Sequence, residues 1–277
     1  MIYAGLWAAS SAFLLEAPEA GAAFPFILTG LAGLAASAAV WALAPAAPSS
    51  PERPVGRLLA AAAVVLTVHG LVASGWTAGG SVAGTAARIA AYGLAPALLV
   101  ATVGGRWRGP RGAGRLGPWA ILIAAAAALL AAVVFAGPSL ARVAALRPSA
   151  ATLGWAAPAC FLWLTVAVAL GEAFVFRVGL QGRLEAMLGS SLGAAALLAL
   201  LFGLGHAWGL HLRPEASYAG PGASLLQAMA LGVAGLSPVG LLFGVIWSRT
   251  RSLGLVVLLH VALDFLPCLP DFLRAWS

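Results

Sequence analysis

Long apolar stretches, separated by short polar segments, run along the whole chain. Most of them reach the roughly 17–25 residues that span a hydrocarbon core. The first is short, and the sixth is long enough to leave the membrane and continue along its surface, so the pattern predicts eight or nine transmembrane helices. Hydropathy places the helices at 2–15, 21–46, 58–78, 82–103, 118–137, 151–187, 192–211, 223–248 and 252–268.

Composition supports a membrane protein. Of the 277 residues, 62% are hydrophobic and only 8% are charged, and the mean hydropathy is +1.00. A soluble domain needs far more polar surface than this. We therefore predict an all-α fold, a polytopic membrane helix bundle whose water-exposed parts are small loops.

The net charge of +7 does not indicate nucleic acid. Basic residues that bind a polyanion cluster on one solvated face, whereas here they lie between apolar runs. The expected partner is the lipid bilayer, and we expect no nucleic acid. Arginine replaces lysine throughout and Ala and Gly abound, which indicates a GC-rich genome and favours a bacterial inner (cytoplasmic) membrane.

Two Arg-rich loops, "PSSPERPVGR" and "GGRWRGPRGAGRLG", should be cytoplasmic, because short basic loops resist translocation. The N-terminus is then cytoplasmic too. The segment "PSLARVAALRPSA" is predicted to be an external loop. The first helix lacks the basic start of a signal peptide, and we expect it to be retained.

Ionisable residues are unevenly distributed among the predicted spans. Helices two to five contain almost only Ala, Leu, Val and Gly, apart from His69 and Arg88. The last four spans carry nearly all the ionisable groups that lie within the membrane. We predict N-terminal scaffold helices over 1–150 and a catalytic helical core over 151–277.

Charged residues inside the last spans are candidates for function. A charge at the centre of a spanning helix costs about 2.5–3.5 kcal/mol, so such a residue usually faces a polar interior. Glu172, Arg177 and Asp264 lie in such positions. His260 precedes Asp264 by four residues, which places the two on one helix face.

A second helix repeats this spacing with an aromatic residue. Phe202 and His206 are also four apart, and Gly203 and Gly205 would let another helix or a substrate backbone approach closely. One polar cavity shared by three helices would satisfy all of these groups.

In order and spacing, these pairs resemble the CAAX protease and bacteriocin-processing (CPBP) family of intramembrane endopeptidases. The resemblance covers about residues 155–268, and "GLLFGVIWSRTRSLGLVVLLHVALDFL" is similar to the closing hairpin of the family. The three motifs are Glu-x-x-x-x-Arg at Glu172 and Arg177, Phe-x-x-x-His at Phe202 and His206, and His-x-x-x-Asp at His260 and Asp264.

The resemblance implies a peptide hydrolase without a metal, and the chemistry of the residues agrees. Glu172 would activate water, and neutral His206 and His260 would donate ring N–H bonds to the oxyanion or to the water. Asp264 would hold His260 in one tautomer. The expected supporting or substrate-contacting residues are Arg177 and Phe202.

One position departs from the family. A second glutamate usually follows the first, but here Ala173 follows Glu172. The missing carboxylate would lie four residues before Arg177, whereas Glu172 lies five before it, about 140° around an α-helix. Arg177 must therefore find another partner, such as Asp264, the substrate or a lipid headgroup.

Other mechanisms remain as alternatives. Two histidines and a carboxylate form the ligand set of a catalytic zinc, but no HExxH motif is present and we expect no cofactor. A rhomboid-type serine protease would need Gly where Pro238 follows Ser237. The non-enzymatic alternative is a membrane scaffold, an immunity protein or a transporter, although the paired repeats of transporters are not seen.

The substrate class follows only broadly. We expect a membrane-associated or lipid-modified protein or peptide. A prenylated CAAX protein is the eukaryotic case, and the bacterial cases are a bacteriocin leader, a pro-peptide, or a C-terminal sorting helix as in the myxosortase branch. Among the remaining polar residues, we expect Glu185 and Arg183 to lie at the surface.

Overall fold

The computed structural model describes residues 1–17, 20–44, 86, 90, 137–212 and 224–276, and those residues form helices without a strand. The all-α prediction is confirmed. The helices predicted at 58–78, 82–103 and 118–137 lie outside the described residues almost entirely. The elements are α1 (Ile2–Glu16), α2 (Ala20–Leu43), α7 (Ser139–Leu146), α8 (Ala150–Leu164), η2 (Thr165–Ala169), α9 (Leu170–Ala173), η3 (Phe174–Gln181), α10 (Gly182–Leu188), α11 (Ser191–Gly205), α12 (Ala207–Leu212), α13 (Leu225–Leu231), η4 (Gly232–Leu236), α14 (Ser237–Thr250) and α15 (Leu253–Trp276).

The protein is a multi-pass membrane protein. Five helical stretches are long and apolar enough to cross a bilayer, and α1 is a shorter apolar helix. Large apolar side chains such as Leu162 and Leu258 stay exposed on these stretches, as lipid-facing side chains do. The total of eight or nine spans stays a prediction. The five stretches are Ala23–Leu43, Ala150–Leu188, Ser191–Leu212, Leu225–Thr250 and Leu253–Trp276.

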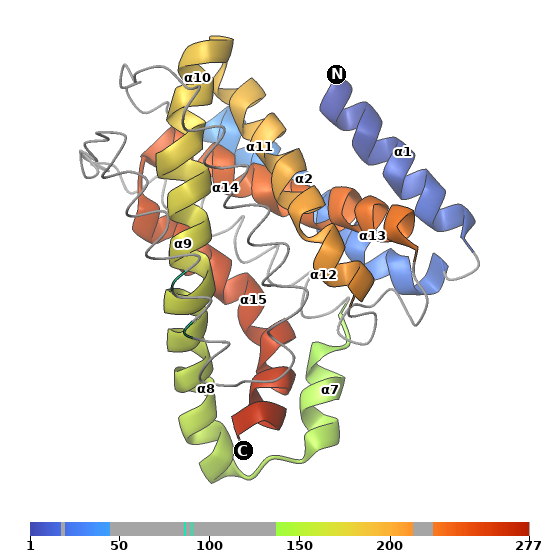
Figure 1. The fold of residues 1–277 in the computed structure, drawn as a ribbon, viewed down its shortest axis with the longest axis vertical. Helices are drawn as coiled ribbons and strands as arrows, with labels where there is room; N and C mark the ends of the chain where they lie inside the picture. The colour runs from blue at the N-terminus through green and yellow to red at the C-terminus, as the bar shows by residue number, and fades with distance from the viewer. Residues whose placement is uncertain (18–19, 45–85, 87–89, 91–136, 213–223, 277) are drawn as a thin grey trace.

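The longest stretch is one continuous rod from Ala150 to Leu188. It appears in Figure 1 as a column through α8, α9 and α10. The Ser149 side chain caps its start by accepting from the Thr152 backbone N–H, and Gly189 ends it in the left-handed conformation. Two π-helical segments, η2 and η3, interrupt the α-helix on either side of α9. Such segments often mark functional sites.

The centre of the bundle is α14. Leu242, Phe243, Val245 and Ile246 are almost wholly buried there, and both α2 and α11 pack against it. Residues of α2 belong to the same apolar core as residues of the last four spans. The division into 1–150 and 151–277 stays a prediction.

One helix was not expected. The segment "PSLARVAALRPSA" forms α7 instead of a loop, and Val143 and Leu146 pack against the core. Arg142 donates to Asp271 at 2.9 Å, which ties α7 to the last helix. That last helix, α15, also runs eight residues beyond its predicted end at 268.

One close backbone crossing involves one of the two glycines singled out in the sequence. A Cβ added to Gly203 would collide with the carbonyl oxygen of Gly232 and lie 2.9 Å from Cβ of Ser237, whereas one added to Gly205 would meet nothing within 4 Å. The close approach expected at Gly203 is therefore confirmed, and it fixes how α11 crosses η4.

Gly203→Ala should lower the free energy of unfolding by about 1–3 kcal/mol, because the added methyl forces the two backbones apart. Gly205→Ala is the matched control on the same helix and should not destabilise the protein. Thermal unfolding in detergent compares the two. Equal melting temperatures for both variants would contradict the tight crossing.

Candidate active site

Two helices bring three of the four predicted catalytic side chains together. Glu172 from α9 and His260 from α15 are buried, with 5% and 3% of each residue exposed. The His260 Nε2 atom lies 3.8 Å from Glu172 Oε2 and 3.2 Å from Asp264 Oδ2. Asp264 is the most open of the three, with 38% of its side chain exposed. Glu172 Oε2 is buried and has no hydrogen-bond partner among the residues that the structure describes.

Two carboxylates facing one imidazole nitrogen determine where that ring carries its proton. A carboxylate only accepts hydrogen bonds, and both face Nε2 of His260. The proton therefore resides on Nε2, donated toward Asp264. The expectation that Asp264 holds His260 in one tautomer fits this geometry.

An aromatic side chain lies between the two histidines. The ring of Phe202 is 4.6 Å from that of His206 and 6.0 Å from that of His260, measured between centroids. Phe176 and Phe243 pack edge-on against Phe202. Phe202 thus sets the positions of both imidazoles as well as filling the core.

The His206 tautomer differs from the one that a neutral oxyanion donor needs. Its Nδ1 atom lies 2.7 Å from the backbone carbonyl oxygen of Phe202. Because a carbonyl only accepts, Nδ1 carries the proton, and a neutral ring then has a lone pair at Nε2. Neutral His206 can orient water through Nε2, whereas donation to an oxyanion through Nε2 requires the doubly protonated ring.

Arg177 has partners within the chain other than Asp264, which was one of the three partners suggested by the sequence. Its guanidinium donates to the side-chain oxygen of Gln181 at 3.1 Å and to the backbone oxygen of Gly240 at 2.9 Å. It is 1% exposed. It still interacts electrostatically with Glu172.

The 140° separation between Glu172 and Arg177 assumed an α-helix, and this assumption was wrong. Arg177 lies in η3, which is π-helical. A π-helical turn bonds residue i to i+5 and so holds more residues than an α-turn. A five-residue spacing therefore brings the two side chains closer to one face.

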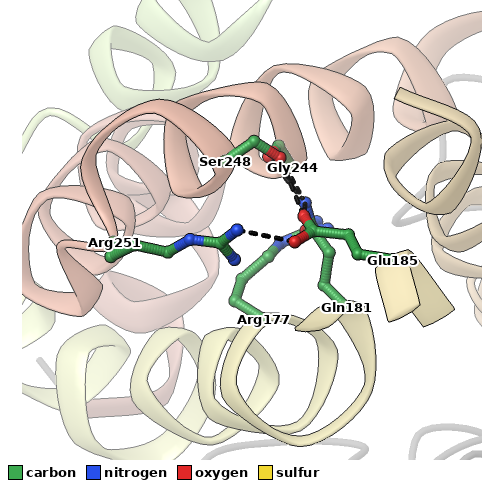
Figure 2. Close-up of polar contacts among 6 residues, drawn as sticks. All are labelled: Arg177, Gln181, Glu185, Gly244, Ser248 and Arg251. Atoms are coloured by element: carbon green, nitrogen blue, oxygen red, sulfur yellow. Dashed lines mark hydrogen bonds and ion pairs between the residues drawn. The ribbon is translucent and has the colours of Figure 1, made fainter. Parts of the chain in front are cut away.

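A polar network that adjoins the candidate active site was not predicted from the sequence. It consists of Arg177, Gln181, Glu185, Ser248 and Arg251, joined by hydrogen bonds and an ion pair (Figure 2). The signal in the sequence was the four-residue repeat of polar side chains at 177, 181 and 185.

Glu185 and Arg183 do not lie at the surface as predicted. Glu185 forms a 2.6 Å ion pair with Arg251 that leaves only 9% of its side chain exposed. Arg183 is 8% exposed and donates to the backbone oxygen of Gly179 at 2.5 Å. Both side chains are buried because each reaches a polar partner. Arg183 reaches backbone carbonyl oxygens, and Glu185 reaches the guanidinium of Arg251.

The serine alternative is not supported by the geometry. Ser237 is fully buried, and its hydroxyl donates to the backbone oxygen of Val233 at 2.7 Å. The Tyr3 hydroxyl lies 2.9 Å from the Ser237 hydroxyl oxygen. Ser237 thus has a structural role in joining α1 to α14.

A zinc site is not formed by the described part of the chain. No group of three or more His, Cys, Asp or Glu side chains there is arranged to hold a metal ion. Cys160 lies in the apolar core, and Cys268 packs against that core.

Comparison with protein families gives one match. Residues 154–266 match the family model described as "Type II CAAX prenyl endopeptidase Rce1-like". The matched segment contains every candidate catalytic residue, and it confirms the resemblance drawn from the motifs. Searches of curated proteins and of solved structures gave no match.

The two site histidines should be opposite tautomers when neutral, with the proton on Nδ1 in His206 and on Nε2 in His260. Their ring ¹⁵N signals in the membrane-embedded protein report this directly, and His206→Gln and His260→Gln assign them. A His206 signal from a ring protonated only at Nε2 would contradict the bond to the Phe202 carbonyl.

Proposed function

Because the chain belongs, through residues 154–266, to the Rce1-like family of type II CAAX prenyl endopeptidases, we propose that it is an intramembrane endopeptidase whose base is Glu172. The observation that supports this most is the free oxygen of Glu172. A buried carboxylate oxygen normally has a hydrogen-bond partner. Within the described part of the chain Glu172 Oε2 has none, and a water molecule bound there would supply one.

The reaction that fits these residues is direct attack by water. Glu172 takes a proton from the water as its oxygen attacks the peptide carbonyl carbon. The C–N bond of the resulting tetrahedral oxyanion then breaks, and Glu172 returns the proton to the leaving amine. No bond between enzyme and substrate forms.

The histidines and Asp264 complete the site. His260 can turn its Nε2–H from Asp264 to the developing oxyanion, since the same atom already faces Glu172. His206 orients the water through Nε2 when neutral, and donates to the oxyanion when doubly protonated. Arg177 and Phe202 hold the base and the imidazoles in place.

The substrate we propose is a membrane-associated or lipid-modified protein or peptide. The site lies between helices that are long enough to cross a bilayer, so the scissile bond must reach it from the lipid or from the membrane surface. Substrates with a lipid anchor and substrates with a C-terminal membrane helix both satisfy this condition. The expected location is the inner membrane of a bacterium.

Glu172→Gln should fold and lose cleavage by a factor of about 10² to 10⁴, because Gln keeps the shape and cannot accept the proton. Two probes are tested with the protein in nanodiscs. One is a farnesylated peptide ending in Cys-aliphatic-aliphatic-X, and the other carries a cysteine before a C-terminal membrane helix with a basic tail. Mass spectrometry of the products gives the rates.

Glu16→Gln, at an exposed carboxylate on α1, is the matched control and should cleave as the wild type does. Which probe is cut identifies the substrate class. Equal rates for Glu172→Gln and the wild type, or no cleavage of either probe by the wild type, would favour the non-catalytic scaffold instead.

Chelation should leave the activity unchanged, since Glu172 can activate water without a metal ion. The measurement is the cleavage rate before and after EDTA, with metal content determined on the same sample. Activity that is lost with EDTA and restored by zinc would replace the glutamate mechanism with a metal-dependent one.

A further inference from the structure

The polar network connects the catalytic helix to the hairpin between α14 and α15. On one side Arg177, Gln181 and Glu185 follow one another at four-residue intervals, and on the other Gly240, Gly244 and Ser248 do the same. Figure 2 shows Arg177, Gln181 and Glu185 on the side facing Gly244 and Ser248. Gln181 lies at the centre and is completely buried.

The Gln181 amide is fixed at both ends. Its oxygen accepts from Arg177 at 3.1 Å. Its nitrogen donates to the Gly244 backbone oxygen at 2.8 Å, and it lies 2.9 Å from the Ser248 hydroxyl and 3.2 Å from a Glu185 oxygen. Because a guanidinium only donates, the amide cannot be reversed. The side chain is therefore held in one orientation.

The opposite helix leaves room for the guanidinium. A Cβ on Gly244 would lie 3.2 Å from an Arg177 terminal nitrogen and 2.8 Å from Cβ of Ala195. At the outer end, the 2.6 Å pair between Glu185 and Arg251 joins the same rod to the turn that follows α14. Bonds at three levels thus prevent the helices from sliding past each other.

We propose that Gln181 is a positioning residue that holds the Arg177 guanidinium beside Glu172 and so does the work of the acidic partner absent at Ala173. This inference rests on the proposed function of Glu172. The positive charge attracts the carboxylate across a medium of low dielectric and limits the directions in which it can point. A misplaced base loses rate even when its chemistry is intact.

The test uses Gln181→Met, which keeps the volume and removes the amide. With the probe that the wild type cleaves, kcat should fall about ten- to a hundredfold while KM stays unchanged. In an Arg177→Met background, Gln181→Met should cause no further loss, because Gln181 acts only through Arg177. Thr165→Val removes another side-chain hydrogen bond from the same rod and should leave kcat unchanged.

A rescue variant covers the case in which Arg177→Met has no measurable activity. Adding Ala173→Glu to Gln181→Met gives Arg177 an acceptor four residues away and should restore part of kcat. Wild-type kcat in Gln181→Met, or independent losses in the double variant, would overturn the inference. Where the double variant cannot be measured, failure of the rescue would overturn it.

The outcome for Glu172 separates the two proposals. An inactive Glu172→Gln together with a fully active Gln181→Met removes the positioning role and leaves the endopeptidase in place. A fully active Glu172→Gln, or a wild type that cleaves neither probe, removes both.

Discussion

A carboxylate buried between apolar helices, with one oxygen left free, is the constraint on which the structure depends. Glu172 cannot be placed there without compensation, because an isolated buried charge is very costly. The compensation comes from His260, which faces it at 3.8 Å, and from the electrostatic interaction with Arg177. Neither forms a hydrogen bond to Oε2, so the group is stabilised and still able to accept a proton.

The helices around Glu172 are shaped by this requirement. The two π segments on either side of it change the direction in which the following side chains point, because a π-turn holds more residues than an α-turn. The crossing at Gly203 and Gly232 lets α11 approach closely. That approach brings the Phe202 ring between the two imidazoles. Backbone geometry therefore places side chains that lie far apart in the sequence.

The sequence was sufficient for features that depend on composition and on regular spacing. The spans from residue 150 onward were predicted to within a few residues except for the end of α15, because long apolar runs are a strong signal. His260 and Asp264 were paired correctly, since residues four apart share a face of an α-helix. The resemblance to the family followed from three short motifs that occur in the expected order along the chain.

Features that depend on tertiary contacts could not be predicted. No residue type marks a π segment, so Arg177 was placed on the wrong side of its helix. The ion pair of Glu185 needs Arg251 from the turn between α14 and α15. The helix α7 is short and carries Arg residues, as short basic loops do. The tautomer of His206 depends on a backbone carbonyl four residues earlier, which is visible only in three dimensions.

The central claim, that Glu172 activates water and does not attack the peptide itself, can be tested by one isotope measurement. A single turnover is run in H₂¹⁸O with enzyme in excess over the cleaved probe, and both product and protein are analysed by mass spectrometry. Direct attack by water places ¹⁸O only in the new carboxyl terminus of the product. Label found in the Glu172 side chain would show a covalent acyl intermediate and contradict the account.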